Sequence, residues 1–341
     1  MGQAAAPREG ASSRPILGVT LGDASGIGPE IVACLLAREE TYTLARPLVF
    51  GDSDILARGA EVAGVVLRPH PIASPAEARL EPGEPDVVDI GILARPLPPF
   101  GAVSAEVGRA SAEYTRLAAE AALRREIRGL VSGPVSKAAL HLAAPGAASD
   151  AEYLARLTGA AGVQGMIGVE GLRVFTVTQH VALARVPGLV SRARVLGAIR
   201  TAASALPSMG VERPRIAVAG LNPHAGDGGL FGLEEIQEIA PAIADARREG
   251  IDAVGPLPDD TVFVRCHRGE FDAVVAMFHA QANVAVKMIG FGRGVSVTIG
   301  LPFPRATTAH GVGLDIAGSG RASAGSLIDA YELVARMASR G

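Results

Sequence analysis

The sequence predicts an α/β fold with a largely parallel β-sheet. Short runs of β-branched and other apolar residues alternate with longer segments of helical periodicity along almost the whole 341-residue chain. A chain of this length favours about two domains. No internal repeat or long linker interrupts the alternation, so the two domains are expected to pack closely together.

The first strand is expected at residues 16–21, and Pro29 suits the first turn of the helix that follows it in PEIVACLLAREE. Each further strand is a short apolar run bounded by turn residues, and each long helix carries its apolar residues on one face. These strands are expected at residues 48–50, 87–90, 129–131, 174–177, 216–219, 273–277 and 295–299. Long helices are expected at residues 104–125, 192–206, 233–248 and 326–340.

The composition argues against several classes of protein. The net charge is −3 and the basic residues are scattered, so neither a nucleic acid nor a membrane surface is an expected partner. No uninterrupted apolar run approaches the roughly 18 residues of a membrane-spanning helix. The two cysteines, Cys34 and Cys266, form no motif and fit a reducing cytosol. Residues 1–14 lack the apolar core of a signal peptide and are expected to be a disordered tail, which favours a cytoplasmic location.

Polar loops follow several of the predicted strands. Since open α/β sheets bind ligands at the carboxyl ends of their strands, these loops are expected to share one cleft. They are GDASGIGPE (22–30), SGPVSK (132–137), TQHVAL (178–183), GLNPHAGDGG (220–229) and MFHAQA (277–282).

Three histidines, His180, His224 and His279, each lie just after a predicted strand. Three neutral imidazoles with open positions could hold a divalent metal ion that polarises a substrate oxygen. The alternative is that each histidine is a hydrogen-bonded structural residue. The glycine-rich loops match neither GxGxxG, GxxxxGK[ST] nor GxSxG, which argues against a Rossmann site, a P-loop and an α/β-hydrolase.

Four basic residues, Lys137, Lys287, Arg293 and Arg305, lie in apolar or glycine-rich surroundings and therefore need partners. The partner is either a carboxylate within the protein or an anionic group on a substrate. Lys287 and Arg305 lie near His279 in the sequence, which favours the substrate for these two.

Eight stretches in order along the chain resemble the 4-hydroxythreonine-4-phosphate dehydrogenases of pyridoxine biosynthesis and their relatives. They are GDASGIGPE, SGPVSKAAL, TQHVALARV, GLNPHAGDGGLFGLEE, GPLPDDT, DAVVAMFHAQ, KMIGFGRGVSVTIGLPFPR and HGVGLDIAGSGRA. The resemblance implies an isocitrate/isopropylmalate-dehydrogenase-like fold, with two α/β domains, an active site in the cleft between them, and a homodimer. The first domain would comprise residues 15–138 and 291–341, and the second, with the metal histidines and dimer contacts, residues 139–290.

The resemblance also implies roles for individual residues. The family's metal histidines match His180, His224 and His279, for one divalent ion such as Zn²⁺, Mn²⁺, Co²⁺, Ni²⁺ or Mg²⁺. The segment from His310 and Gly311 to Asp315 resembles the loop that holds the adenosine end of NAD or NADP. Lys137 and Asp260 are candidates for moving protons. The implied chemistry is oxidation of a secondary alcohol, after which a β-keto acid can lose CO₂.

The substrate pocket departs from the family pattern. The family's Gly-His-Thr-Glu aligns with residues 149–152, so that Asp150 and Ala151 replace a potential cation and a hydroxyl donor. Ser296 replaces an asparagine, whereas Lys287 and Arg305 are retained. These five positions are the expected substrate contacts, and the change of charge predicts a different substrate, with hydroxyls or an amine opposite Asp150.

The function expected from these features is a metal-dependent NAD(P) dehydrogenase that oxidises and decarboxylates a small anionic hydroxy acid or diol. One alternative is true 4-phosphohydroxy-L-threonine oxidation in pyridoxine biosynthesis. Others are a catalytically lapsed ligand-binding relative, against which the three histidines argue, and a metal-dependent hydrolase or lyase, against which HGVGLDIAG argues.

Overall fold

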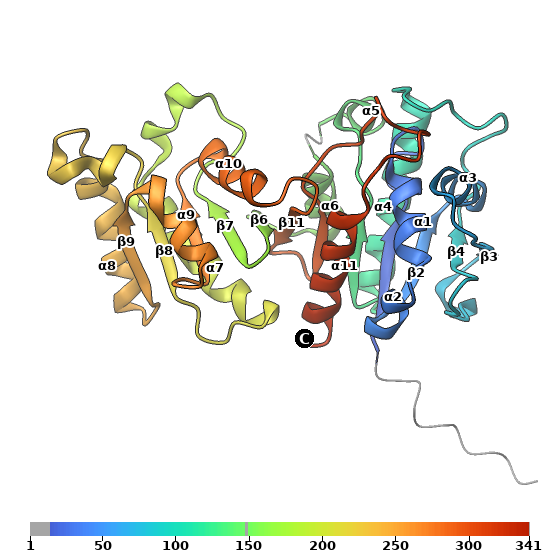
Figure 1. Ribbon diagram of the computed structural model, residues 1–341, viewed down its shortest axis with the longest axis horizontal. Coiled ribbons are helices and arrows are strands. Elements are labelled where there is room, and N and C mark those ends of the chain that lie inside the picture. The colour runs from blue at the N-terminus through green and yellow to red at the C-terminus, as the bar shows by residue number, and fades with distance from the viewer. Residues whose placement is uncertain (1–13, 147–148, 341) are drawn as a thin grey trace, which may run out of the picture.

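The computed structural model describes residues 14–146 and 149–340, so the tail expected at residues 1–14 lies outside it except for Arg14. Within the described residues the strands form one 12-stranded sheet in the order β3-β4-β2-β1-β5-β12-β11-β6-β7-β10-β8-β9 (Figure 1). The strands are β1 (Ile16–Thr20), β2 (Arg46–Gly51), β3 (His70–Ile72), β4 (Asp86–Asp89), β5 (Gly129–Ser132), β6 (Gln164–Val169), β7 (Leu172–Thr176), β8 (Ile216–Ala219), β9 (Ala253–Leu257), β10 (Ala273–Ala276), β11 (Val295–Ile299) and β12 (Arg305–Thr308).

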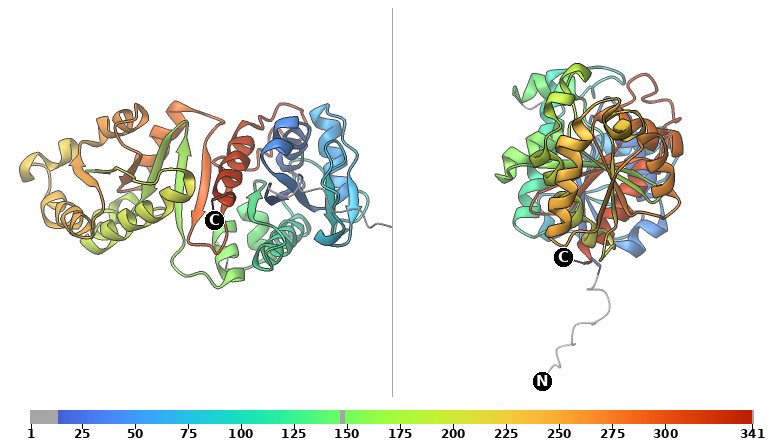
Figure 2. Two further views of the ribbon diagram at one scale, coloured as in Figure 1. Left: turned by 90° about the horizontal axis from the view of Figure 1, so that it is seen from below. Right: turned by 90° about the vertical axis from the view of Figure 1, so that its left-hand side faces the viewer.

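Helices cover both faces of the sheet, as the end-on view in Figure 2 shows. They are α1 (Gly28–Leu36), α2 (Glu39–Leu44), α3 (Ser53–Ala63), α4 (Ala105–Leu123), α5 (Lys137–Ala143), α6 (Asp150–Thr158), α7 (Arg192–Ala205), α8 (Ala240–Arg248), α9 (Asp259–His267), α10 (His279–Ile289) and α11 (Gly325–Ala338). Strands β1, β5, β8 and β10 are apolar and almost fully buried between these layers. The predicted α/β fold is confirmed.

The sheet changes direction in its middle. Strand β11 pairs antiparallel with β12 and β6, and β6 pairs antiparallel with β7, whereas the other pairings of the described strands are parallel. As a result, the parallel strands on the two sides of this ribbon run in opposite senses along the sheet. We call the part from β3 to β12 the first half and the part from β7 to β9 the second half.

Each of the eight predicted strands corresponds to an observed strand, but β3, β6, β9 and β12 were not predicted. Their sequences, HPI, QGMIGV, AVGPL and RATT, contain proline, glycine or polar residues that hide the apolar pattern.

The helix predicted at residues 233–248 is wrong in its first part. A π-helical turn, Glu235–Ile239 (η6), precedes α8, because Pro241 has no N–H group to continue a regular ladder of hydrogen bonds.

The division into two domains stays a prediction. Helices α5 and α6 pack against α4 of the first half. No helix in the described part of the chain is both long enough and apolar enough to cross a membrane.

Candidate active site

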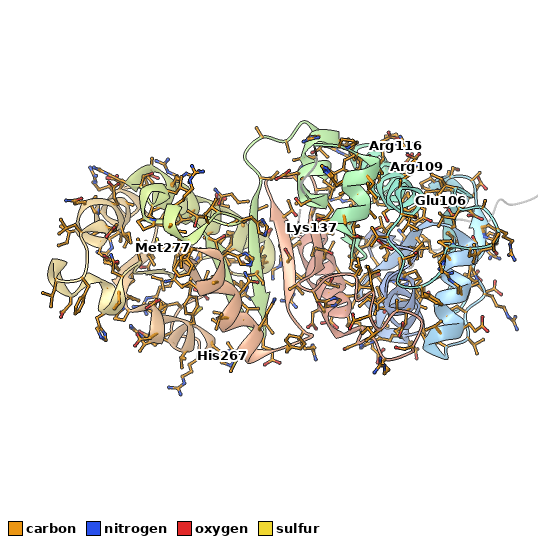
Figure 3. The ribbon with its side chains drawn as sticks, turned by 90° about the horizontal axis from the view of Figure 1, so that it is seen from above. Glu106, Arg109, Arg116, Lys137, His267 and Met277 are labelled. Carbon is orange, nitrogen blue, oxygen red and sulfur yellow. The ribbon has the colours of Figure 1, made fainter. Side chains whose placement is uncertain are left out.

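A cavity of about 440 Å³ lies over the antiparallel middle of the sheet. One wall comes from the β5–α5 loop, the start of α6, and β12. The other comes from β6, β7 and the start of α10, and β11 also lines it. Figure 3 shows Lys137, one of the lining residues, near the middle of the molecule where the two halves meet.

Three of the five polar loops reach this cavity: SGPVSK, TQHVAL and MFHAQA. The GDASGIGPE and GLNPHAGDGG loops do not line it, because they follow β1 and β8, which lie one strand further from the middle of the sheet than β5 and β10. The predicted site residues that line the cavity are Lys137, Asp150, Ala151, His180, His279, Ser296, Arg305, His310 and Gly311. Those that do not are His224, Asp260, Lys287 and Asp315.

The structure brings His180 and His279 together. Strand β7 runs on alongside β10 beyond its last residue, because the N–H groups of Val177 and Thr178 donate to carbonyls of β10 and Met277 at 2.9 and 3.1 Å. His180 follows this extension and His279 begins α10, so their ring centroids lie 5.1 Å apart. Two imidazoles at this spacing could bind the same metal ion.

Electrostatics favour the ligand form of His279. Its pKa is lowered, first by burial and then by the neighbouring His180 and lysine side chains. The neutral imidazole, which is the form that binds a metal ion, is therefore stabilised.

The side chain of Gln281, on the first turn of α10, holds the carboxyl ends of β10 and β8 together. Its Oε1 accepts from the Met277 N–H at 2.7 Å, and its Nε2 donates to the Gly220 carbonyl at 2.9 Å and to Asp259 Oδ2 at 3.1 Å. The amide therefore joins the ends of β10 and β8 to the start of α9.

The loop after β8 carries His224 in a left-handed turn. Residues 224–228 all have positive φ, including 54° at His224, 55° at Ala225 and 43° at Asp227. Such angles cost about 1 kcal/mol or more for each residue other than glycine, and strained backbone of this kind is concentrated at functional sites.

His224 lies apart from the other two histidines. Its nearest described ring is that of Phe231, at a centroid distance of 6.5 Å. Within residues 14–146 and 149–340, no three His, Cys, Asp or Glu side chains are placed to hold a metal ion together. The structure thus brings two of the three expected ligands, His180 and His279, side by side, and does not place His224 with them.

Arg305 forms the opposite wall of the cavity and is 1% exposed. Its Nε donates to Ser132 Oγ at 3.1 Å, and its Nη1 donates to Thr298 Oγ1 at 3.0 Å. Its Nη2 forms a short charged hydrogen bond with Asp150 Oδ2. Asp150 is the first residue of α6 and follows the N-cap Ser149, whose Oγ accepts the helix N–H of residue 152.

Sequence reasoning missed Ser132 and Thr298 as partners of Arg305. A signal was available, because both polar residues follow or lie within apolar strands, where a buried hydroxyl needs a partner. Among the other basic residues, Arg293 forms a two-point ion pair with Asp329 at 2.7 and 2.8 Å. Its partner is therefore a carboxylate within the protein, which was one of the two expected kinds of partner.

The segment after β12 packs on the β1–α1 loop. The Ile27 N–H donates to the Val312 carbonyl at 2.9 Å, and the Ala322 N–H donates to Glu30 Oε1 at 3.1 Å. His310 and Gly311 line the cavity at the start of this segment, whereas Asp315 is exposed outside it.

Buried oxygens of the β1–α1 segment could receive a polar cofactor group. Asp23 Oδ2, Ser25 Oγ and Glu30 Oε2 have no hydrogen-bond partner among the described residues. Hydroxyl or amino groups of a dinucleotide are donors that fit such acceptors. Sequence reasoning did not single these residues out.

A polar cavity lined by paired histidines and buried charges, set over an α/β sheet, defines the protein as a small-molecule enzyme of the α/β class. The model of the family "Pyridoxal phosphate biosynthetic protein PdxA" matches residues 43–334. The chain belongs to this family, and the predicted resemblance is confirmed.

The relatives agree over almost the full length. A protein named "Putative D-threonate 4-phosphate dehydrogenase" from Symbiobacterium thermophilum is 43% identical, covering 96% of this chain and 97% of its own. A 4-hydroxythreonine-4-phosphate dehydrogenase from Desulfosudis oleivorans is 41% identical, covering 94% and 95%. The crystal structure of a 4-hydroxythreonine-4-phosphate dehydrogenase from Burkholderia phymatum superposes with a TM-score of 0.81 at 40% identity, covering 95% and 98%.

Proposed function

We propose that this protein is a divalent-metal-dependent NAD(P) dehydrogenase that oxidises a small anionic hydroxy acid or diol and decarboxylates the product. The observation that carries the proposal is the pair of histidines, 5.1 Å apart, in a cavity that also holds Lys137 and Arg305. The dehydrogenase names of the full-length relatives support the reaction class.

The residues of the cavity would have different roles in this reaction. A divalent ion and a nicotinamide cofactor would supply the Lewis acidity and the hydride acceptor of this reaction. His180 and His279 would hold the ion, and His310 and Gly311 would lie along the cofactor. Lys137, an exposed residue at the start of α5, can bind an anionic group or pass a proton through its Nζ.

Residues outside the cavity have weaker geometric support. Asp260 is exposed on α9, and Lys287 is exposed two turns along α10, although Lys287 contributes to lowering the pKa of His279. We propose that Lys287 acts on the site through its charge. For Asp260 as a proton carrier, support comes from the family resemblance alone.

A homodimer would explain the position of His224. The turn that carries it is followed by exposed apolar side chains, Leu230 at 72%, Leu233 at 50% and Ile236 at 51% exposure. Contact between two chains would cover these side chains and could bring His224 to a His180–His279 pair. Sedimentation of the purified protein, with and without Leu230→Glu, tests this proposal.

The decisive experiment is NAD(P)H formation, followed by absorbance, with metal-reconstituted protein. The panel contains D-threonate 4-phosphate, 4-phosphohydroxy-L-threonine, their unphosphorylated acids and cis-dihydrodiol carboxylates. We expect a signal that a chelator abolishes and that His180→Ala removes, whereas His267→Ala keeps it, because His267 is exposed near the lower edge of the view in Figure 3 and does not line the cavity. Turnover that survives both the chelator and His180→Ala would contradict the metal-dependent mechanism.

A further inference from the structure

We propose that Asp150 makes this site select a substrate that presents a hydrogen-bond donor, a hydroxyl or an ammonium group, to the Arg305 wall, and reject an anionic group there. The inference deepens the proposed function, since it assumes that the cavity is the substrate site. Its test measures binding alone and needs no turnover.

The first step is that Arg305 is already neutralised. Its three nitrogens donate to Ser132, to Thr298 and to Asp150, and the side chain is 1% exposed. A substrate phosphate or carboxylate could reach this guanidinium only by displacing Asp150 or by lying beside its carboxylate. Like charges at such short range repel strongly in a partly desolvated cavity.

The second step is that Asp150 itself offers an acceptor. Its Oδ2 is used by Arg305, whereas its side chain is 24% exposed and the residue lines the cavity. The second oxygen, Oδ1, can accept from a substrate hydroxyl or ammonium group, and the bond would be charge-assisted. The side chain of Ala151 beside it is only a methyl group, so it adds no side-chain donor for an anion.

The third step is the charge of the whole cavity. The cations Lys137 and Arg305 are matched by the carboxylates Asp150 and Glu152. Among the described residues Lys137 forms no ion pair within 4.0 Å, so it remains the cation for a substrate anion. The substrate class that fits has one anionic end near Lys137 and one donor end near Asp150.

Three ligands that differ at one position test this selection. They are threonate with a C4 hydroxyl, 4-amino-4-deoxythreonate with a C4 ammonium group, and threonate 4-phosphate with a C4 dianion. Binding is measured by calorimetry on metal-reconstituted protein without NAD. We expect the hydroxyl and ammonium ligands to bind wild-type protein at least about tenfold more tightly than the phosphate. Preference for the phosphate, or no binding of any ligand, would overturn the proposal.

The variant Asp150→Asn removes the charge but keeps the size of the side chain. We expect it to bind threonate 4-phosphate and inorganic phosphate at least about tenfold more tightly than wild-type protein does. It should lose affinity for the ammonium ligand more than for the hydroxyl ligand, which tells the two donors apart. Equal phosphate affinity in the variant and the wild type would refute the role of Asp150.

Glu106→Gln is the control, because it removes one carboxylate from the first turn of another helix, α4, where the exposed side chain does not line the cavity. We expect it to change phosphate affinity less than about threefold, and an effect as large as that of Asp150→Asn would overturn the specific role. A thermal melt of each variant checks its folding. If Asp150→Asn is unfolded, the relative affinities of the three ligands for wild-type protein still test the proposed selection. Loss of the proposed dehydrogenase activity would leave these binding results unchanged, so the two proposals can fail separately.

Discussion

Glu235 accepts a hydrogen bond from the side-chain amide of Asn222 at 2.9 Å and is itself 2% exposed. Its other oxygen accepts the backbone N–H groups of Leu221 and Asn222 at 2.7 and 2.8 Å. One buried carboxylate therefore holds the entry to the left-handed turn that carries His224. The strained turn persists because this contact fixes the residues before it.

Gly226 is the position where this turn is least tolerant of a side chain. A Cβ there would lie 2.8 Å from Glu235 Oε2, whereas a Cβ at Gly228 would meet open space, and both glycines have positive φ. We expect Gly228→Ala to lower the free energy of unfolding by about 1 kcal/mol from backbone strain alone, and Gly226→Ala by about 2 to 3 kcal/mol. Urea unfolding of both variants measures the difference, and equal losses would show that Glu235 does not constrain the turn.

Gln281 should matter for stability as well as for the site. Gln281→Ala leaves the Met277 N–H and the Gly220 carbonyl without their partner, so we expect a loss of about 1 to 3 kcal/mol in unfolding free energy. The exposed Gln237 provides the control, because Gln237→Ala removes an amide of the same size at the surface. If both changes cost the same, the amide bridge between the strand ends contributes nothing.

Metal affinity tests the histidine pair directly. We expect His180→Ala and His279→Ala each to weaken binding of Mn²⁺ or Zn²⁺ by at least about tenfold, since each removes half of the pair. His267→Ala is the control, because this histidine ends α9 and is exposed. Titration calorimetry of the three variants gives the affinities. Unchanged binding in both site variants would place the ion elsewhere.

The pH dependence of stability should reveal the cost of ionising the buried carboxyl of Asp23. Burial raises the pKa of its carboxyl above the ordinary 3.8, although hydrogen bonds from the backbone N–H groups of Ser25, Gly26 and Ser136 oppose the shift. Because the pKa is higher in the folded state, ionisation of Asp23 costs stability, and this cost is absent below pH 3.8 and grows as the pH rises toward the folded value. Asp23→Asn removes it.

We therefore expect the melting temperature of Asp23→Asn, relative to wild-type protein, to rise between about pH 4 and pH 7. The exposed Asp252 serves for comparison, since Asp252→Asn removes a carboxylate that water already solvates. A difference between Asp23→Asn and wild type that stays constant with pH would contradict the cost assigned to burial.

The sequence predicted the class of fold and most of the buried strands, because their apolar runs are continuous. It did not show which strands are neighbours. His180 and His279 lie together because β7 pairs with β10, which follows it by about a hundred residues. The reversal of direction at β11 and β6 was equally hidden. The strand order, in which β5, β7 and β10 lie nearer the middle of the sheet than β1 and β8, decides which polar loops reach the cavity.

The contacts of individual site residues were harder to predict than the residues themselves. Asp150 and Arg305 were both expected at the site, but as separate contacts of a substrate. They are 155 positions apart, and only the folded chain shows that they bind each other. Glu235 and Gln281 belong to no catalytic or metal-binding motif. Their role in holding loops depends on hydrogen bonds that cannot be predicted from the neighbouring sequence.

The antiparallel ribbon also determines how the cavity can change its width. Strands β12, β11, β6 and β7 are joined in one hydrogen-bonded ladder, so β12 and β7 stand roughly 14 Å apart at the usual strand spacing. The two halves of the sheet are joined by this ladder and not by a flexible loop. A rotation of one half against the other must therefore twist the four strands along their length. The torsional stiffness of four strands, rather than the freedom of a hinge, limits how far the Arg305 wall and the histidine wall can separate when a substrate enters.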